Sequence, residues 1–377
     1  MERFAKNTLR MAAVFATAIV LCLAAVAAYL IYPGTPGNSK CMNFEGYIEL
    51  PRDRSLNILD YLTIDNGALF VTSESSGSLF KVDIDPNHPS LSAVSELPGG
   101  GAAHGVALTM DRNVAFVTRS EENTVDVFDP TSLRLLSRIP VADDADAILY
   151  VPSAKLVYVA NGDAKIATLI DPEKRITVGT VALPGRPEFL AWDFQTGALY
   201  QNLEDINSIV AVDLGRREVI GQWSLAPCEG PSGMAIDTGQ RRLFAVCSRN
   251  ATLVVFDLES HQVITSLKIG GGPDSVAFDR SLHRIYCAGK AGRLTIIQQD
   301  SPNDYRVLDE IHTHYGAHTL ALDPLSHRVF VAYASLFAHP RISVFSPARV
   351  NNVQKREEEG PFYAAALAEW WRDDRED

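Results

Sequence analysis

The sequence predicts an all-β protein, a seven-bladed β-propeller built from four-stranded antiparallel blades. The first observation is a repeat, because seven related stretches begin at residues 60, 104, 146, 188, 232, 274 and 318. They are "DYLTID", "HGVALT", "DAILYV", "EFLAWD", "SGMAID", "DSVAFD" and "HTLALD". Successive starts lie 42 or 44 residues apart, which is typical of propeller blades. The second observation is that short apolar runs, separated by turn residues, recur in the same order within each repeat.

These runs define the strands of each blade. The stretches above are the first strands, and the second strands are "ALFVTS", "VAFVTR", "LVYVAN", "ALYQNL", "RLFAVC", "RIYCAG" and "RVFVAY". The third strands are "SLFKVD", "TVDVFD", "IATLID", "SIVAVD", "TLVVFD", "RLTIIQ" and "RISVFS". A weaker fourth run follows, as in "RITVGTVAL" and "EVIGQWSL". The runs are rich in Val, Ile, Phe and Tyr and are bounded by Asp, Asn, Gly and Pro, which favours strands joined by hairpins.

The two ends of the repeat region predict how the ring closes. The last repeat ends at residue 346 without a clear fourth strand, whereas "FEGYIEL", residues 44–50, stands alone before the first repeat. We expect this N-terminal strand to complete the seventh blade and to remove an exposed sheet edge. The predicted divisions are a basic end with an apolar segment (1–33), a linker (34–43), the propeller (44–347) and a charged tail (348–377).

Two stretches resemble a known family. "VYVANGDAKIATLIDPEKRITVGTVALPGRPEFLAWD" and "VAFVTRSEENTVDVFDPTSLRLLSRIPV" are similar to the YVTN-type (YncE-like) β-propeller repeats of exported bacterial proteins. The resemblance covers residues 44–347, and it implies the propeller fold. Members of the group mostly serve as extracytoplasmic binding modules, while similar propellers elsewhere are lactonases and lyases. "LYQNLED" and "KAGRLTIIQQD" depart from the family pattern.

The N-terminus carries a targeting signal. Arg3, Lys6 and Arg10 precede the uncharged residues 11–32, which as one helix would span about 33 Å. We expect a membrane anchor with the propeller outside the cytoplasm, periplasmic or extracellular. The alternative is a secreted protein, because Ala25-Val26-Ala27 fits a signal-peptide cleavage site. Leu21 before Cys22 argues against lipidation.

Composition excludes one class of partner. The net charge of −12 and the absence of dense Lys/Arg runs argue against nucleic-acid binding. No CxxC motif occurs among the five cysteines, so zinc ribbons and covalent haem are not indicated. Cys228 and Cys247 are expected on one face of the fifth blade, where a disulfide and two buried thiols are equal alternatives.

The segment "HTHYGAH", residues 312–318, contains three of the nine histidines. Aligned with "SLKIGGGPD", His318 falls on Asp274, at the start of an inner strand, whereas His312 falls at the end of an outer strand. His314 lies in the crossing between them. We therefore do not expect one metal site that uses all three.

The alignment instead predicts a ring of residues at one mouth of the channel. Its members are Asp60, His104, Asp146, Glu188, Ser232, Asp274 and His318. Because the seventh blade adjoins the first, His318, Asp60 and His104 would form an arc suited to a divalent metal, with Glu188 or Asp146 as general base. The structural alternative is that the ring residues bond backbone N–H groups of the crossing loops. These side chains could point into the channel or between the blades.

Two functions follow from these expectations. The favoured one is a binding or scaffold module whose loop face, with Arg119, Glu121, Arg249, Lys290 and Tyr333, meets a small molecule or a protein. It needs no cofactor, and no catalytic signature occurs. The alternative is a metal-dependent lactonase or lyase that uses the His/Asp ring. After the propeller, "PFYAAALAEWW" (361–371) has the pattern of a short amphipathic helix.

Overall fold

The computed structural model describes residues 15–26, 36–37, 39–51, 56–111, 113–333, 335–336 and 340–348. The chain divides into one unit that contains the propeller, Met1–Pro347, and a second, Ala348–Asp377. The basic N-terminal end and the amphipathic segment expected at residues 361–371 lie outside the described residues.

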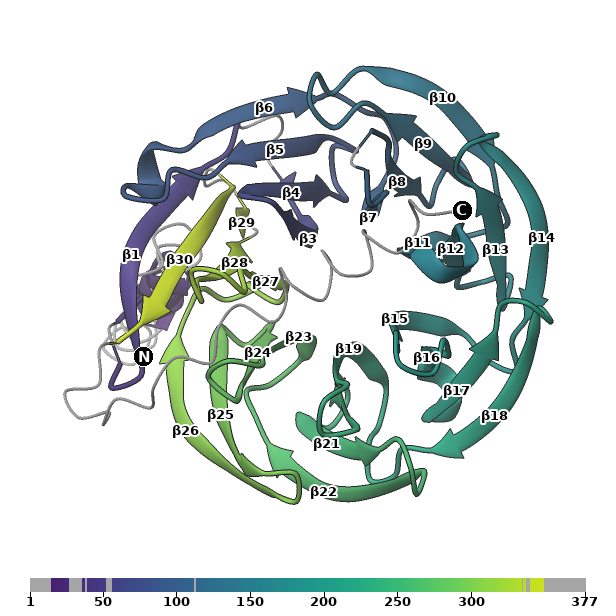
Figure 1. Ribbon diagram of the computed structural model, residues 1–377. Helices are drawn as coiled ribbons and strands as arrows, with labels where there is room; N and C mark the ends of the chain where they lie inside the picture. Colours follow the sequence, from purple (N-terminus) through teal and green to yellow (C-terminus); the bar gives the residue numbers. More distant parts are fainter. Residues whose placement is uncertain are drawn as a thin grey trace, which may run out of the picture. The chain divides into compact units, whose positions relative to one another are not determined.

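Seven four-stranded antiparallel sheets stand in a ring, each with its first strand at the centre (Figure 1). Blade 1 contains β3 (Leu59–Asp65), β4 (Ala68–Ser73), β5 (Leu79–Asp83) and β6 (Ala93–Leu97); blade 2 contains β7 (Ala103–Leu108), β8 (Ala115–Arg119), β9 (Thr124–Phe128) and β10 (Leu135–Pro140). Blade 3 contains β11 (Ala145–Val151), β12 (Leu156–Asn161), β13 (Ile166–Asp171) and β14 (Ile176–Ala182); blade 4 contains β15 (Pro187–Trp192), β16 (Leu199–Leu203), β17 (Ser208–Asp213) and β18 (Glu218–Ser224). Blade 5 contains β19 (Pro231–Asp237), β20 (Arg242–Cys247), β21 (Thr252–Asp257) and β22 (Gln262–Lys268); blade 6 contains β23 (Pro273–Asp279), β24 (Arg284–Gly289), β25 (Arg293–Ser301) and β26 (Asp304–His312). The predicted seven-bladed fold is confirmed.

Blade 7 takes strands from both ends of the propeller. It consists of β27 (Leu320–Leu322), β28 (Val329–Tyr333), β30 (Arg341–Pro347) and, at its outer edge, β1 (Met42–Glu49). β1 pairs with β30 from Met42 opposite Pro347 to Glu49 opposite Arg341. A second, short pairing joins β2 (Leu56–Asn57) to β29 (Ser335–Leu336). The N-terminal strand therefore closes the ring as the sequence predicts.

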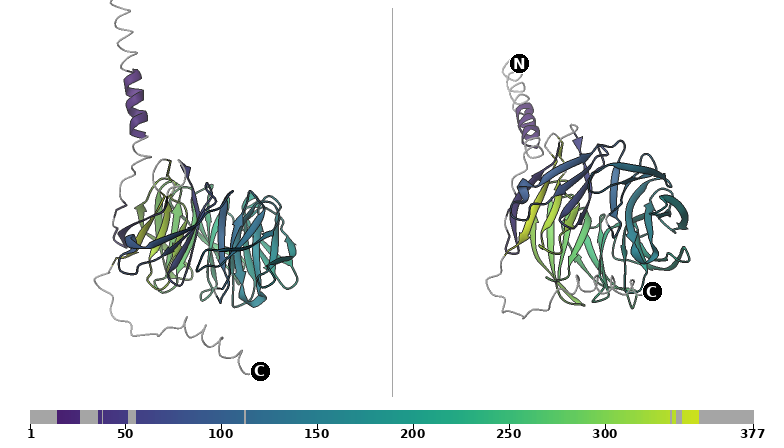
Figure 2. Two further views of the ribbon diagram at one scale, coloured as in Figure 1. Left: turned by 90° about the horizontal axis from the view of Figure 1, so that it is seen from above. Right: turned by 45° about the horizontal axis from the view of Figure 1, so that its top comes forward.

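The core lies between the blades. The described residues contain seven buried apolar clusters, and each cluster fills the space between two neighbouring blades. Between blades 1 and 2, for example, the rings of Phe70 and Phe128 lie 6.3 Å apart, and both side chains are buried. This follows from the strand patterns, because inner strands covered on both faces carry nearly continuous apolar runs. Figure 2 shows the ring side-on at the left, with the strands of all blades running between the same two faces.

The first strand of blades 1 to 6 contains a β-bulge near its start. In blade 1, Leu59 faces Ser73 and Leu62 faces Val71, so that Asp60 and Tyr61 together face Thr72. The same register shift recurs in blades 2 to 6. A bulge interrupts the strict alternation of a strand and redirects the side chains at that point. Alternation alone therefore does not give the side-chain direction of the ring residues, and the bulge decides it.

The other predictions for the fold concern the N-terminus and the cysteines. Residues 15–26 are helical, and the two ends of the predicted apolar segment 11–32 lie outside the described residues. Within the part of the chain that the structure describes, no helix is both long and apolar enough to span a membrane. Cys228 and Cys247 form a disulfide with a Cα–Cα distance of 5.3 Å, and Cys41 and Cys287 are buried free thiols.

Candidate functional site

All seven residues of the predicted ring line one cavity of about 410 Å³ at the centre of the propeller. In blades 1 to 6 the ring residue is the second residue of the first strand and lies within the bulge. In blade 7, His318 lies two residues before β27. The bulges thus turn these side chains towards the channel, which the sequence left open. That they bind a ligand stays a prediction.

A second set of residues lines the same cavity, and the sequence analysis missed most of it. Glu74, Glu204, Ser248 and Lys290 each follow directly after the second strand of their blade. In blades 4, 5 and 6 this position lies 16 residues after the ring position, so the repeat alignment contains the signal. Only Lys290 was anticipated, as a residue of the loop face. The cavity therefore has two tiers of polar side chains.

The closest contact in the cavity joins Asp60 of blade 1 to His104 of blade 2. The Nδ1 atom of His104 lies 2.5 Å from Oδ2 of Asp60, and its Nε2 lies 2.9 Å from the hydroxyl oxygen of Ser120. Burial lowers the pKa of His104, but the hydrogen bond and the charge of Asp60, together with the charge of Asp146, outweigh it and raise the pKa to about 9. At neutral pH His104 is thus an imidazolium that donates both N–H groups.

Asp146 of blade 3 completes the group that comes nearest to a metal site. Asp60, His104 and Asp146 each offer a ligand atom within 4.8 Å of the others, a donor set that suits a divalent transition metal. The sequence placed His318 in this group instead of Asp146, and metal binding by either set of residues stays a prediction. His318 donates from Nδ1 to the carbonyl oxygen of Gly316 at 2.5 Å, and its Nε2 lies 3.6 Å from Asp274. His318 is not one of the three residues of this group.

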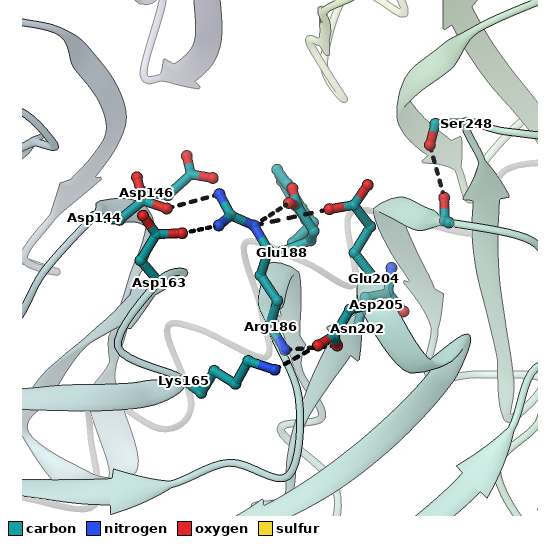
Figure 3. A network of polar contacts seen from close by, with 12 residues as sticks. Asp144, Asp146, Asp163, Lys165, Arg186, Glu188, Asn202, Glu204, Asp205 and Ser248 are labelled. Carbon is teal, nitrogen blue, oxygen red and sulfur yellow. Dashed lines mark hydrogen bonds and ion pairs between the residues drawn. The ribbon is translucent and has the colours of Figure 1, made fainter.

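The wall formed by blade 4 combines two carboxyl groups and one guanidinium (Figure 3). The Nε atom of Arg186 lies 3.7 Å from Glu188 and 3.8 Å from Glu204, beyond hydrogen-bonding range. The guanidinium donates instead to Asp144 at 2.7 Å and to Asp163. Burial, followed by the charges of Asp146 and Glu204, raises the pKa of Glu188 to about 10. Arg186 therefore only partly neutralises this wall.

Burial and the nearby carboxylates also raise the pKa of Asp146. Burial raises the pKa of Asp146 to about 7, although the positive charge of His104 opposes the shift. On the opposite side of the cavity, Asp274 is better neutralised, because the Nζ atom of Lys290 lies 3.3 Å from its Oδ2. The two carboxyl groups whose pKa values burial raises most, Asp146 and Glu188, therefore lie on the neighbouring blades 3 and 4.

Two aromatic side chains stack on each other in the wall of the cavity. Tyr61 of blade 1 and Phe189 of blade 4 stack with ring centroids 5.6 Å apart and an interplanar angle of 11°, and both line the cavity. The equivalent residues of blades 2 and 5 are glycines. A Cβ on Gly105 would lie 2.8 Å from Ile148, and one on Gly233 would lie 2.5 Å from the carbonyl oxygen of Asp274. A side chain at either position would thus collide with the first strand of the next blade.

The departure "LYQNLED" from the repeat pattern supports this wall. The Nε2 atom of Gln201 donates to the carbonyl oxygens of Glu188 at 2.7 Å and Phe189 at 3.0 Å. Asn202 donates to the carbonyl oxygen of Ser232 in the next blade at 2.7 Å. Gln201 and Asn202 are fully buried, so they fix the bulge that presents Glu188 and Phe189 to the cavity.

The three histidines of "HTHYGAH" lie in different surroundings, as the sequence predicts. His312 ends β26 and is exposed, whereas His314 is 1% exposed and bonds the hydroxyl of Tyr47 at 2.9 Å. Burial lowers the pKa of His314 to about 4, so it is neutral near pH 7. It contributes to the closure of blade 7 by β1 rather than to the cavity.

The structure partly corrects the residues predicted on the loop face. Arg119 and Tyr333, predicted on the loop face, are buried, because Arg119 pairs with Asp126 at 3.1 Å and Tyr333 packs on His314. The structural alternative for the ring, bonds to backbone N–H groups of the crossing loops, stays a prediction. Ser232 donates instead to the carbonyl oxygen of Pro273 at 3.2 Å, and Asp60 and Asp274 contact the side chains described above.

The fold and the site define a seven-bladed β-propeller with an acidic, aromatic-floored cavity at its centre. No family model matches the chain, and no curated protein matches it, so the YVTN-type resemblance stays a prediction. Among solved structures, the chain is similar to one titled "Kuenenia stuttgartiensis Hydrazine Synthase". The two are 17% identical with a TM-score of 0.63, over 80% of this chain and 95% of that chain. At this identity the likeness shows the propeller fold alone.

Proposed function

We propose that this protein is a ligand-binding propeller whose central cavity takes a small cationic ligand. The observation that carries the proposal is the charge of the cavity lining. Six carboxyl groups face about 410 Å³, those of Asp60, Glu74, Asp146, Glu188, Glu204 and Asp274. Among the described residues that line the cavity, three carry a positive charge at neutral pH, His104, Arg186 and Lys290, and Arg186 also pairs with Asp144 and Asp163.

The protonation of the carboxyl groups supports this proposal. Buried carboxylates are costly unless a positive charge compensates them. The raised pKa values of Glu188, about 10, and Asp146, about 7, mean that protons replace the missing positive charge. A bound cation would favour the ionised forms and release these protons. Binding should therefore strengthen as the pH rises.

Calorimetric titration of the purified full-length protein tests the proposal. The ligands are Mg²⁺, Ca²⁺, Mn²⁺, Zn²⁺ and butylamine, each at pH 6 and pH 8. We expect at least one cation to bind with one site per chain, more tightly at pH 8. Glu188→Gln should weaken that binding about tenfold, whereas Glu229→Gln should leave it unchanged. Glu229 is exposed on the loop that enters blade 5 and does not line the cavity, so it is a matched control. Absence of binding by every cation contradicts the proposal.

A second candidate function is a metal-dependent lactonase or lyase, favoured by the grouping of Asp60, His104 and Asp146. These three residues would hold the metal ion, which would polarise a substrate oxygen. His104 would have to release its Nδ1 proton first, so metal affinity should fall steeply below pH 9. Glu188, with a pKa of about 10, is suited to donate a proton rather than to accept one as general base. Metal analysis of the purified protein, combined with lactone hydrolysis by wild type and His104→Ala, tests this candidate.

For the location of the protein, we propose an extracytoplasmic propeller tethered by residues 11–32. The basic flank of this segment and the Cys228–Cys247 disulfide support the proposal, because disulfides persist in oxidising compartments. The loop face around the cavity would then meet its ligand or a protein partner outside the cytoplasm. Protease treatment of intact spheroplasts tests this location. A propeller that stays protected until the cells are lysed contradicts it.

A further inference from the structure

Four of the six carboxyl groups of the cavity lie at two ends of the floor that the Tyr61 and Phe189 rings form. At one end, blade 1 contributes Asp60 and Glu74, and at the other, blade 4 contributes Glu188 and Glu204. Blade 5, next to blade 4, contributes only the hydroxyl groups of Ser232 and Ser248. In a ring of seven blades, blades 1 and 4 stand across the channel from each other, as Figure 1 shows for β3 and β15. These four carboxyl groups are thus divided between opposite sides, and Asp146 of blade 3 and Asp274 of blade 6 also line the cavity.

The floor connects these two ends. Tyr61 directly follows Asp60, and Phe189 directly follows Glu188, so each aromatic residue is the chain neighbour of an acidic residue. The rings stack near-parallel at 5.6 Å, which means that the two side chains meet in the middle of the channel. An elongated apolar body can lie over this floor with a polar group at each end.

The carboxyl groups of the lining limit what a ligand can offer. An ionised carboxylate accepts hydrogen bonds and donates none. An ammonium group supplies donors and no acceptor, which matches these carboxylates.

We propose that the ligand is a linear aliphatic diammonium compound that lies across the cavity. One ammonium group would bind at the wall of Glu188 and Glu204, where it would add to the partial neutralisation by Arg186, and the other would bind beside Asp60 and Glu74. The methylene chain would cover the stacked rings of Tyr61 and Phe189. This inference rests on the proposed binding of a cationic ligand and names the chemical class of that ligand. A metal ion would leave the floor uncovered, and a monoamine would neutralise only one of the two ends.

The test compares ligands that differ in one charge. Purified full-length protein is titrated with putrescine, cadaverine, spermidine and butylamine at pH 8, and with Mg²⁺ and Zn²⁺ as metal probes. We expect the best diamine to bind at least about tenfold more tightly than butylamine, because its second ammonium adds charge-assisted hydrogen bonds. Glu74→Gln should reduce the affinity for the diamine about tenfold and change the affinity for butylamine far less. Glu229→Gln, on the exposed entry loop, should change neither.

The outcomes separate this inference from the function on which it rests. Equal affinities for butylamine and the diamines, or binding of the metal ions alone, would overturn the diammonium proposal and leave a cation-binding cavity. No binding of any cation would overturn both. A Tyr61→Leu variant gives an independent measurement, since removal of one ring should weaken diamine binding more than metal binding. Unchanged diamine affinity in this variant would contradict the placement of the methylene chain over the Tyr61 and Phe189 rings.

Discussion

Replacement of Glu188 by glutamine is expected to make the ligand-free protein more stable at neutral and alkaline pH. The side chain of Glu188 is largely buried, and its pKa rises from the usual 4.5 to about 10. In the folded protein Glu188 therefore keeps its proton at pH 7, whereas in the unfolded chain it is ionised. The folded state binds more protons than the unfolded state throughout this range, so the free energy of unfolding falls as the pH rises from about 4.5 to 10.

The size of this effect follows from the same two values. Stability decreases by about 1.4 kcal/mol for each pH unit above 4.5, or about 3 kcal/mol at pH 7. Asp146 and Glu204 interact with Glu188, so part of the effect would pass to them in the variant. We therefore expect Glu188→Gln to gain about 1 to 3 kcal/mol at pH 7. At pH 4 the variant and the wild type should be equally stable, because a protonated carboxyl and an amide are similar in size and polarity.

Urea unfolding at pH 4, 7 and 9 measures these differences. The wild type should lose stability as the pH rises, and the variant should lose less, with a remaining slope from Asp146 and His104. Glu229→Gln, on the exposed entry loop, controls for the change in net charge. A Glu188→Gln protein that is less stable than wild type at pH 9 would refute the reasoning, because it would mean that the carboxylate is favourably ionised in the folded state.

Three further predictions concern other parts of the molecule. Asp60→Asn should lower the pKa of His104 from about 9 by more than one unit, because the hydrogen bond and the negative charge of Asp60 raise it; NMR titration of the imidazole would show this, and an unchanged value would contradict the pairing. Joint replacement of Cys228 and Cys247 by alanine should cost about 3 kcal/mol for a loop of 19 residues, as measured by urea unfolding of the oxidised protein and the variant. Ile48→Ala on the closing strand should cost about 3 kcal/mol, whereas Asn43→Ala on its exposed side should cost under about 0.5 kcal/mol; similar losses would mean that β1 does not close the core.

Much of the fold could be predicted because each blade is nearly a local structure. Four consecutive apolar runs pair with their neighbours in the chain, so the repeat period gives the number of blades directly. The closing strand was also predictable, since residues 44–50 had the pattern of a strand with no local partner, while the last repeat lacked one. The positions of Asp60, His104 and Glu188 around one mouth followed from the alignment of the repeats.

The site itself depended on information that the repeat does not contain. A strand with strict alternation would place Asp274 on the same side as Val276, yet the bulge between Pro273 and Ser275 breaks that relation. Whether a strand bulges depends on which residue of the neighbouring strand it faces, and no pattern within the strand records this. The grouping of His104 with Asp60 and Asp146 likewise depends on side-chain positions that the repeat pattern does not contain.

The sequence by itself thus determined the seven blades, their closure and the set of residues at the channel mouth, because these depend on periodicity along the chain. Only the tertiary structure decided that these residues face a single cavity, that Tyr61 and Phe189 meet across it, and that Glu74 and Glu204 join its lining. Contacts across the ring involve residues from blades far apart in sequence, so their geometry is set by closure of the whole propeller. Charges that are unremarkable in the sequence become an under-neutralised acidic cavity only when closure brings them together.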